Sequence, residues 1–451
     1  MRGMELRSRR FAVIGSGASG CYAVEALLRG DPDLRVDVIE RLPTPFGLIR
    51  YGVAPDHQGT KAVTRTLGRI LEQERVTFFG GVYAGRDISL AEIRSRYDAV
   101  ILATGVNRDR QLQLPGETLA GVVGSGALAS WYNDHPFATD FSGLVAGAKR
   151  VLIIGAGNVA IDVARMFLKG ANGFDGSDIS PSVLKAFCSQ SERRIVIVAR
   201  RGPEHAKFSL SELRELVRQA PGRVFLNPRT RAAFFQGGSN TSAFAVGAAW
   251  PEILALPDTP GDAFEYSGKH SVEFRFDTHP TAFLPHSSND HLLGAALFLP
   301  TNIGSVSSNY ERLDIDLTIT CIGYAHAIRK DVDIFPGVLA NKDGRISERL
   351  YVVGWAKRGP SGAIGINRTD SHQVADFALK ETIPMVGLNA ASIGIRPLLE
   401  KAGARWVDYQ GWKRIDSKET RNAASNRARL KISSYSELIS TATNATGQLG
   451  I

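Results

Sequence analysis

Cysteine is scarce in this sequence, and its spacing does not suit the sites that cysteines usually build. The 451 residues include only Cys21, Cys188 and Cys321, and no Cys-x-x-Cys pair occurs. This absence argues against a disulfide framework, a zinc ribbon, an iron–sulfur cluster and a redox-active dithiol. Because each cysteine has apolar or small neighbours, we expect three buried, unreactive thiols and no metal site.

Long apolar runs are also lacking. No run reaches the roughly 18 residues that a membrane-spanning helix needs. The basic N-terminus is followed by a strand and a glycine loop rather than by a signal-peptide core with a cleavage site. We therefore expect a cytoplasmic protein without a membrane span.

Acidic residues are outnumbered, with 45 Asp and Glu against 54 Lys and Arg, which gives a net charge of +9. Part of the excess lies between Arg396 and Lys431. A basic face attracts acidic proteins, anionic membranes or nucleic acid, although it can also be solvated without any partner. Nucleic acid is the weakest of these options, because no recognised nucleic-acid motif accompanies the charge.

The length predicts two domains, and the first begins with a dinucleotide-binding pattern. Residues 11–14 predict a buried strand, "GSGASG" provides the glycine loop, and residues 20–29 predict a helix. The next strand, "RVDVIE", ends in Glu40, where a carboxylate can bind ribose hydroxyls. The pattern therefore predicts dinucleotide binding by Gly15, Gly17, Ala18, Gly20 and Glu40.

A second unit of the same kind has a different ending. A strand at 150–154 precedes the loop "GAGNVA", with Gly155, Gly157, Asn158, Val159 and Ala160, and a helix follows. The next strand, "IVIVA", ends in Arg200 and Arg201. An arginine there binds a 2′-phosphate that an acid would repel. The two endings predict FAD at the first loop and NADP(H) at the second, although two arginines can also be ordinary surface charges.

Three further stretches carry a resemblance to a known family: "LPTPFGLIRYGVAPDH", "RRGPEHAKFSLSELREL" and "YVVGWAKRGPSGAIGINRTDS". With both glycine loops, they make the chain similar to the adrenodoxin-reductase family of NADPH:ferredoxin reductases. The resemblance implies an α/β fold of two three-layer Rossmann-like domains, with the NADP domain inserted in the FAD domain. We expect FAD-domain parts at 1–110 and 325–451 and the NADP domain at 111–324.

The resemblance also implies roles for single residues. Leu48 and Ala84 would join the first loop and Glu40 in contacting FAD, and Glu212 would join the second loop and the arginines in contacting NADPH. Residues near the flavin ring would be Trp355, Gly362, Ala363 and Ile364, with Gly362 also close to the nicotinamide. His57 and Glu215 match polar residues near the flavin and are the catalytic candidates.

Several of these residues have simpler explanations. Trp355 and Leu48 could be core side chains, Glu212 and Glu215 could be solvated, and His57 could cap a turn. Residues 237–310 match the family poorly, apart from a strand predicted at "VEFRF".

The expected activity is electron transfer from NADPH through FAD, by hydride and then single-electron steps, to an acidic ferredoxin that docks on a basic surface. We expect a monomer. The alternatives are an NADPH-dependent flavin reductase or oxidase of small molecules and an electron-input subunit of a larger complex.

Overall fold

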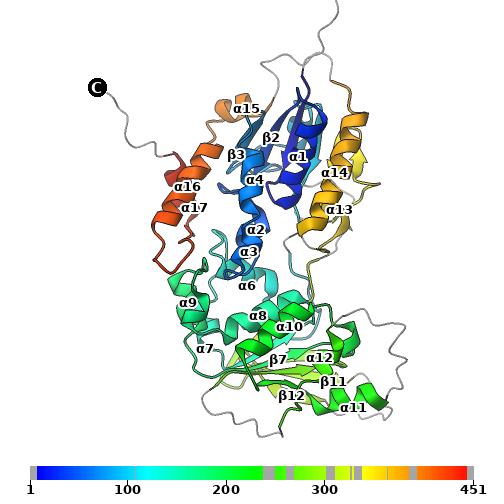
Figure 1. The fold of residues 1–451 in the computed structure, drawn as a ribbon, viewed down its shortest axis with the longest axis vertical. Coiled ribbons are helices and arrows are strands. Elements are labelled where there is room, and N and C mark those ends of the chain that lie inside the picture. Colours follow the sequence, from blue (N-terminus) through cyan, green and yellow to red (C-terminus); the bar gives the residue numbers. More distant parts are fainter. Residues whose placement is uncertain are drawn as a thin grey trace, which may run out of the picture.

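Two six-stranded sheets organise the chain, one in the upper and one in the lower half of the view in Figure 1. The computed structural model describes residues 8–106, 108–236, 249–260, 269–300, 310–325, 328–329, 338–362, 364–384 and 394–443.

The first sheet is parallel except at one edge, where β16 pairs antiparallel with β17. Its central strand β1 is apolar from Phe11 to Ile14 and buried throughout, as expected for a strand covered on both faces. In spatial order its strands are β16 (Arg345–Ser347), β17 (Leu350–Val352), β4 (Ala99–Leu102), β1 (Arg10–Ile14), β2 (Arg35–Glu40) and β3 (Val76–Gly80).

Helices cover both faces of this sheet. Phe11 and Val13 point into the core under one helical layer, and Ala12 and Ile14 point into the other. The first layer contains α1 (Ala18–Gly30), α4 (Thr64–Leu71), α14 (Ile364–Glu381), α16 (Tyr409–Arg421) and α17 (Tyr435–Thr443), and the second contains α5 (Leu90–Arg94) and α15 (Arg396–Lys401). Short helices α2 (Gly47–Tyr51), α3 (Gln58–Lys61) and α13 (Trp355–Arg358) complete this half.

The second sheet is parallel throughout. The strand predicted at "VEFRF" is confirmed as β9, which lies between β7 and β8. In spatial order the strands are β5 (Val122–Gly124), β13 (Leu317–Thr320), β6 (Arg150–Ile154), β7 (Arg194–Val198), β9 (Ser271–Arg275) and β8 (Val224–Leu226).

The two faces of the second sheet are covered differently. One face packs against the helices α6 (Ser125–Tyr132), α7 (Ser142–Gly147), α8 (Asn158–Leu168), α9 (Pro181–Phe187), α10 (Leu210–Gln219) and α12 (Trp250–Leu254). The other packs against an antiparallel sheet of β10 (Thr278–His286), β11 (Asn289–Pro300) and β12 (Glu311–Asp314). Helix α11 (Pro228–Gln236) lies beside α12, and β14 (Ile328–Arg329) pairs with β15 (Val338–Leu339).

The chain crosses between the two halves twice, and the two crossings lie side by side. Asp109 and Tyr324 form an antiparallel bridge, the Arg110 N–H donates to the Gly323 carbonyl at 3.0 Å, and the Ala325 N–H donates to the Arg108 carbonyl at 2.7 Å. We propose this double crossing as the domain boundary, which places the ends of the inserted domain at the predicted residues 111 and 324.

The cysteines only partly match expectation. Cys21 is buried, whereas Cys188 and Cys321 are partly exposed, so the prediction of three buried thiols is wrong for these two. Burial nevertheless raises the pKa of all three thiols. Within the described ranges, every helix is too short or too polar to cross a membrane.

Candidate functional site

The first glycine loop follows β1, and packing requires glycine at its first and third positions. Gly15 has a φ of +107°, and a Cβ there would lie 2.4 Å from the Ala103 carbonyl oxygen. A Cβ on Gly20 would lie 1.9 Å from the Gly15 carbonyl oxygen. These contacts hold α1 against the carboxyl ends of β1 and β4.

Gly17 differs from both, because a Cβ added there would meet no atom within 4 Å. It is the N-cap of α1, so the free N–H groups of the first turn, beginning at Ala18, border this open space. The Phe46 N–H donates to the Ser16 carbonyl at 3.1 Å and holds α2 beside the loop. Leu48 on α2 is 36% exposed and lies outside the packed cores, which disfavours a core role.

Glu40 ends β2, and its buried carboxylate is tied to the same loop. One oxygen accepts hydrogen bonds from Ser16 N at 2.9 Å and Ser16 Oγ at 2.8 Å, and the other accepts from Leu42 N at 3.1 Å. A carboxylate has about four acceptor positions, so capacity remains for a ribose hydroxyl. Sequence reasoning missed Ser16, although its place between Gly15 and Gly17 was a usable signal.

The second glycine loop repeats this geometry after β6. Gly155 has a φ of +131°, and a Cβ there would lie 2.3 Å from the Cys321 carbonyl oxygen, whereas a Cβ on Gly157 would meet nothing within 4 Å. Ala160 is fully buried, so a small third residue suits the packing. Val159 is 43% exposed, and Asn158 Oδ1 accepts a hydrogen bond from Ser209 N at 2.9 Å.

Arg200 and Arg201 follow β7 at the sheet edge that carries this loop. Ile154 and Val198 are partners in the parallel ladder, and the Gly155 N–H donates to the Val198 carbonyl at 2.8 Å. Both arginines are exposed. Arg200 and Arg201 therefore follow Val198, the strand residue hydrogen-bonded to Gly155, by two and three positions.

His57, Glu212 and Glu215 meet where the two halves of the chain touch. His57 immediately precedes α3, and both glutamates project from α10. One side-chain atom of each lies within 4.8 Å of the other two, close enough to contact one metal ion. His57 Nδ1 also lies 3.7 Å from Asp162 Oδ1 on α8. The two catalytic candidates, His57 and Glu215, are 158 positions apart in the sequence but are neighbours in the structure.

Arg165 organises this junction, and sequence reasoning missed it. Its fully buried guanidinium pairs with Asp56, with Asp162 at 3.0 Å and with Glu215 at 3.2 Å, and Lys169 also pairs with Asp56. Burial acts to raise the pKa of Asp56, but Arg165 and Lys169 outweigh it and hold the pKa low. Burial raises the pKa of Asp162, and burial and Asp162 raise that of Glu212.

Trp355 begins α13 beside the double crossing. Its ring centroid lies 5.6 Å from that of Tyr324, and its Nε1 is buried without a hydrogen-bond acceptor in the described part of the chain. Preceding Gly354 has a φ of +68°, and a Cβ there would lie 2.0 Å from Ser19 Oγ on α1. Trp355 is therefore a partly buried side chain next to the first glycine loop rather than a member of the packed core.

The remaining predicted residues have mixed surroundings. Gly362 is exposed with a φ of +82°. Ile364 begins α14 and packs against the core between the first sheet and its first helical layer. Ala363 lies outside the described residues. The side chain of Ala84 is buried in the core under the second helical layer, so only its backbone is available for a ligand.

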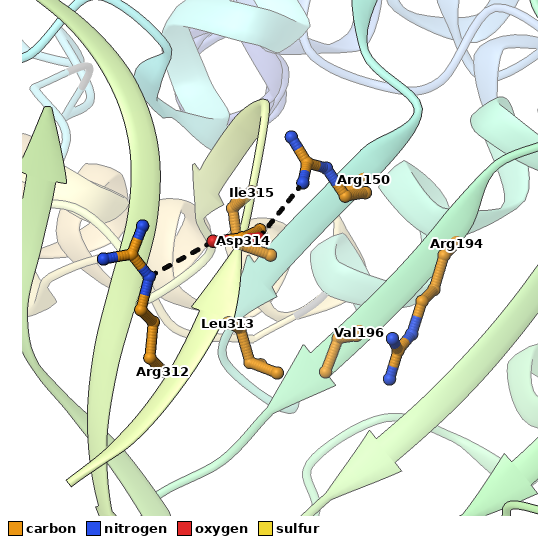
Figure 2. A pocket seen from close by; sticks show the side chains of 7 residues that line it. All are labelled: Arg150, Arg194, Val196, Arg312, Leu313, Asp314 and Ile315. Carbon is orange, nitrogen blue, oxygen red and sulfur yellow. Dashed lines mark hydrogen bonds and ion pairs between the residues drawn. The ribbon is translucent and has the colours of Figure 1, made fainter. Parts of the chain in front are cut away.

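Figure 2 shows a concave surface on the second sheet, lined by residues that include the first residues of β6 and β7, whereas the second glycine loop follows the other end of β6. Arg150, Arg194 and Arg312 line it with apolar side chains from β7 and β12. Asp314 lies 3.7 Å from Arg150 and 3.2 Å from Arg312, and Glu273 lies 3.2 Å from Arg194. Each of the three arginines therefore has a carboxylate partner, and the surface contains no predicted site residue.

The basic segment between Arg396 and Lys431 is largely paired, which reduces the exposed charge that the sequence suggested. Arg396 lies over the rings of Phe79 and Trp406. The ion pairs are Lys413–Glu72, Arg414–Asp408, Lys418–Glu437, Arg427–Asp175, Arg429–Asp416 and Lys431–Asp178.

Comparisons with known proteins agree over most of the chain. Residues 9–201 match the family model described as "Pyridine nucleotide-disulphide oxidoreductase". The NADPH:adrenodoxin oxidoreductase of Salvelinus fontinalis is 33% identical over 96% of this chain and 91% of its own length, and NADPH-ferredoxin reductase FprA of Mycobacterium tuberculosis is 35% identical over 83% and 84%. The structure of that FprA in complex with NADPH superposes with a TM-score of 0.84, at 31% identity, over 97% of this chain and 100% of the other.

Proposed function

Because this chain belongs to the adrenodoxin-reductase family of NADPH:ferredoxin reductases, we propose that it carries electrons from NADPH through FAD to a ferredoxin. The observation that carries the proposal is the pair of glycine loops with opposite charge beside them. A buried carboxylate, Glu40, borders the first loop, and the exposed Arg200 and Arg201 border the second. This difference supports FAD at the first loop and NADPH at the second.

The residues present fit both groups. Gly17 and Gly157 leave open space where a side chain would otherwise stand, and the N-terminus of a helix faces each space. Trp355 offers an indole N–H without an acceptor in the described residues. We assign the FAD site to Gly15, Gly17, Ala18, Gly20, Glu40, Leu48, the Ala84 backbone, Trp355, Gly362, Ala363 and Ile364, and the NADPH site to Gly157, Asn158, Val159, Ala160, Arg200, Arg201 and Glu212.

The protein contributes binding, alignment and electrostatics. When bound, FAD supplies the conversion of a two-electron hydride into single electrons. Arg200 and Arg201 bind the 2′-phosphate, and the free N–H groups at the two helix ends bind the pyrophosphates. Each loop lies at the carboxyl end of a central strand, where the rigid sheets fix its position.

We propose His57 and Glu215 as the polar residues beside the reacting rings. They come from different halves of the chain, so their meeting depends on how those halves dock. Arg165 is a positioning residue, because it holds Glu215 on one side and Asp56 on the other. Together these groups keep protonatable atoms at a fixed place in the junction.

The partner is proposed to be an acidic ferredoxin docking on a basic surface, and the chain to act as a cytoplasmic monomer. The net charge of +9 supports electrostatic docking. Gel filtration tests the monomer, and cell fractionation tests the location.

The deciding experiment mixes the purified protein with NADPH and candidate ferredoxins and follows cytochrome c reduction. Reduction that depends on both a ferredoxin and NADPH supports the proposal. NADPH oxidation at the same rate without any ferredoxin would instead indicate a reductase or oxidase of small molecules, and co-purification in a stable assembly would indicate an electron-input subunit.

A further inference from the structure

A cavity of about 460 Å³ lies between α4 and α16, and no residue of either glycine loop lines it. Residues of α2, α3, α4 and α16 line most of it, and Asp178 from the inserted half also contributes to the lining. Its volume falls in the range of about 300 to 1,000 Å³ that is typical of small-molecule sites. The lining contains none of the residues assigned above to FAD or NADPH.

Positive charge dominates this cavity. Six basic residues line it against three acidic ones, Glu72, Asp178 and Asp416, so basic residues outnumber acidic ones two to one. The basic residues are Arg50, Lys61, Arg65, Arg69, Lys413 and Arg429. Concentrated charge of one sign in a concave site attracts ligands of the opposite sign.

The neighbouring carboxylates do not satisfy all of these cations. Lys61 and Lys431 share the single carboxylate of Asp178, at 2.9 and 3.0 Å. Arg65 and Arg69, one turn apart on α4, are exposed and form no ion pair with an acidic residue of the described ranges. The unbalanced charge therefore resides mainly at the rim.

Arg50 provides an independent indication of a ligand. Its side chain is 5% exposed, and its Nη2 donates to Glu419 at 2.6 Å. Its Nε–H is buried but has no acceptor among the residues that the structure describes. An orphaned N–H on a buried cation is costly unless an acceptor, such as a ligand oxygen, satisfies it.

We propose that this cavity binds a small multivalent oxyanion, either a phosphate ester or a polycarboxylate. Its oxygens accept hydrogen bonds from Arg50 Nε and from the guanidinium groups of Arg65 and Arg69, which match carboxylate and phosphate geometry. More than one negative charge is needed to balance the excess. The proposal is independent of the electron-transfer function.

Because the lining comes from residues 46–72, from Asp178 and from 409–429, a bound anion contacts both halves of the chain. A ligand that binds only the folded state stabilises it in proportion to the logarithm of its concentration. Thermal stability is thus a readout that needs no turnover.

The test uses the full chain with FAD bound and NADP⁺ in excess, so that both dinucleotide loops are occupied. Calorimetric titrations at constant ionic strength use inorganic pyrophosphate and, separately, citrate. We expect saturable binding of at least one anion and a rise in Tm with its concentration. Binding of pyrophosphate alone indicates a preference for phosphate groups, and binding of citrate alone indicates a preference for carboxylates.

The critical variant is Arg65→Ala/Arg69→Ala, since both side chains are exposed and their removal should leave folding intact. We expect its Kd to rise at least about tenfold. The control, Arg29→Ala/Arg35→Ala, removes the same charge from other exposed positions and should change Kd less than about twofold. Arg50→Lys keeps the charge facing Glu419 but lacks Nε, and should also weaken binding.

Equal weakening in the two double variants would overturn the site, because it would indicate a response to net charge alone. Lack of binding of both anions up to about 10 mM would also overturn it. If neither anion binds but an acidic protein binds over Arg65 and Arg69, the surface is a protein-docking surface instead.

Discussion

Lys61 and Asp178 form a buried ion pair between the two halves of the chain, with the ammonium nitrogen 2.9 Å from each carboxylate oxygen. Asn133 accepts a further hydrogen bond from Lys61 at 2.8 Å, and Lys431 brings a second ammonium to Asp178. Burial and the charge of Lys431 lower the pKa of Lys61 to about 7, with a smaller contribution from Arg50, although Asp178 opposes them.

This pKa predicts a pH dependence of stability. The unfolded chain keeps Lys61 protonated up to its ordinary value of 10.5, so between about pH 7 and 10.5 the unfolded state binds more protons. The free energy of unfolding should therefore rise with pH in this window, by at most about 1.4 kcal/mol per pH unit from this group. Urea unfolding at several pH values measures it. Lys61→Gln should flatten the slope and exposed Lys185→Gln should not, whereas equal slopes in all three proteins would contradict the prediction.

The second prediction separates the two nucleotide sites with a matched pair of substitutions. An added methyl meets no atom within 4 Å at Gly17 or Gly157, and both φ angles, −67° and −113°, suit alanine. Gly17→Ala should therefore fold but lose FAD, measured as the flavin-to-protein absorbance ratio. Gly157→Ala should retain FAD and raise the KM for NADPH about tenfold. Gly59→Ala, which also meets no atom, is the control; wild-type behaviour of both loop variants would refute the assignment.

The third prediction concerns the choice between the two nicotinamide cofactors. Replacing Arg200 and Arg201 together by alanine should raise the KM for NADPH by about 10- to 100-fold, because charge-assisted hydrogen bonds to the 2′-phosphate are lost. The KM for NADH, which lacks this phosphate, should change little. Steady-state kinetics with both donors measures the difference, and equal losses would remove the 2′-phosphate assignment.

The fourth prediction tests His57 and Glu215 against a purely structural role. Glu215→Gln keeps the size of the side chain and one acceptor for Arg165, so FAD content and Tm should stay near those of the native protein. The rate of flavin bleaching by NADPH, measured by stopped flow, should fall, and its pH profile should change. His57→Gln should give a similar loss, and the double variant should lose less than the two effects combined, because neighbouring groups are not additive. Unchanged rates and pH profiles would restrict both residues to a structural role.

The fifth prediction concerns docking. If charge steers an acidic ferredoxin to this protein, ferredoxin-dependent turnover should fall as salt rises, because the Debye length shortens from about 30 Å at 0.01 M to about 8 Å at 0.15 M. Reduction of a small neutral acceptor should be much less sensitive and serves as the control. A ferredoxin rate that ignores salt would contradict electrostatic docking.

The sequence predicted the features that local patterns encode. The strand predicted at 150–154 is β6, the helix predicted at 20–29 lies within α1, and Glu40 ends β2 as expected. Buried strands, glycines with forced conformations and the residues at strand ends depend on neighbours within about twenty positions, so their pattern is visible in the sequence.

Features that depend on distant partners were not predictable in this way. Arg165 looks like an ordinary residue in a helix. Packing of α10 on α8 places Glu215 beside it, and only docking of the two halves brings Asp56 to it. The basic count near the C-terminus overstated the exposed charge for the same reason, since Glu72, Asp175 and Asp178 come from elsewhere. Two strands of the antiparallel layer over the second sheet, β10 and β11, lie within residues 237–310, which match the family poorly.

The double crossing at Asp109 and Tyr324 also sets an order of events during synthesis. The ribosome completes all six strands of the second sheet by Thr320. In the first sheet, β4 lacks its neighbour β17 until residues 350–352 are made, and α1 lacks its packing partner α14 until later still. Since domains fold as units while they emerge, the inserted half is able to close on the nascent chain first. The half that contains the first sheet begins its first strand at residue 10, but it completes its fold only after the inserted half has folded.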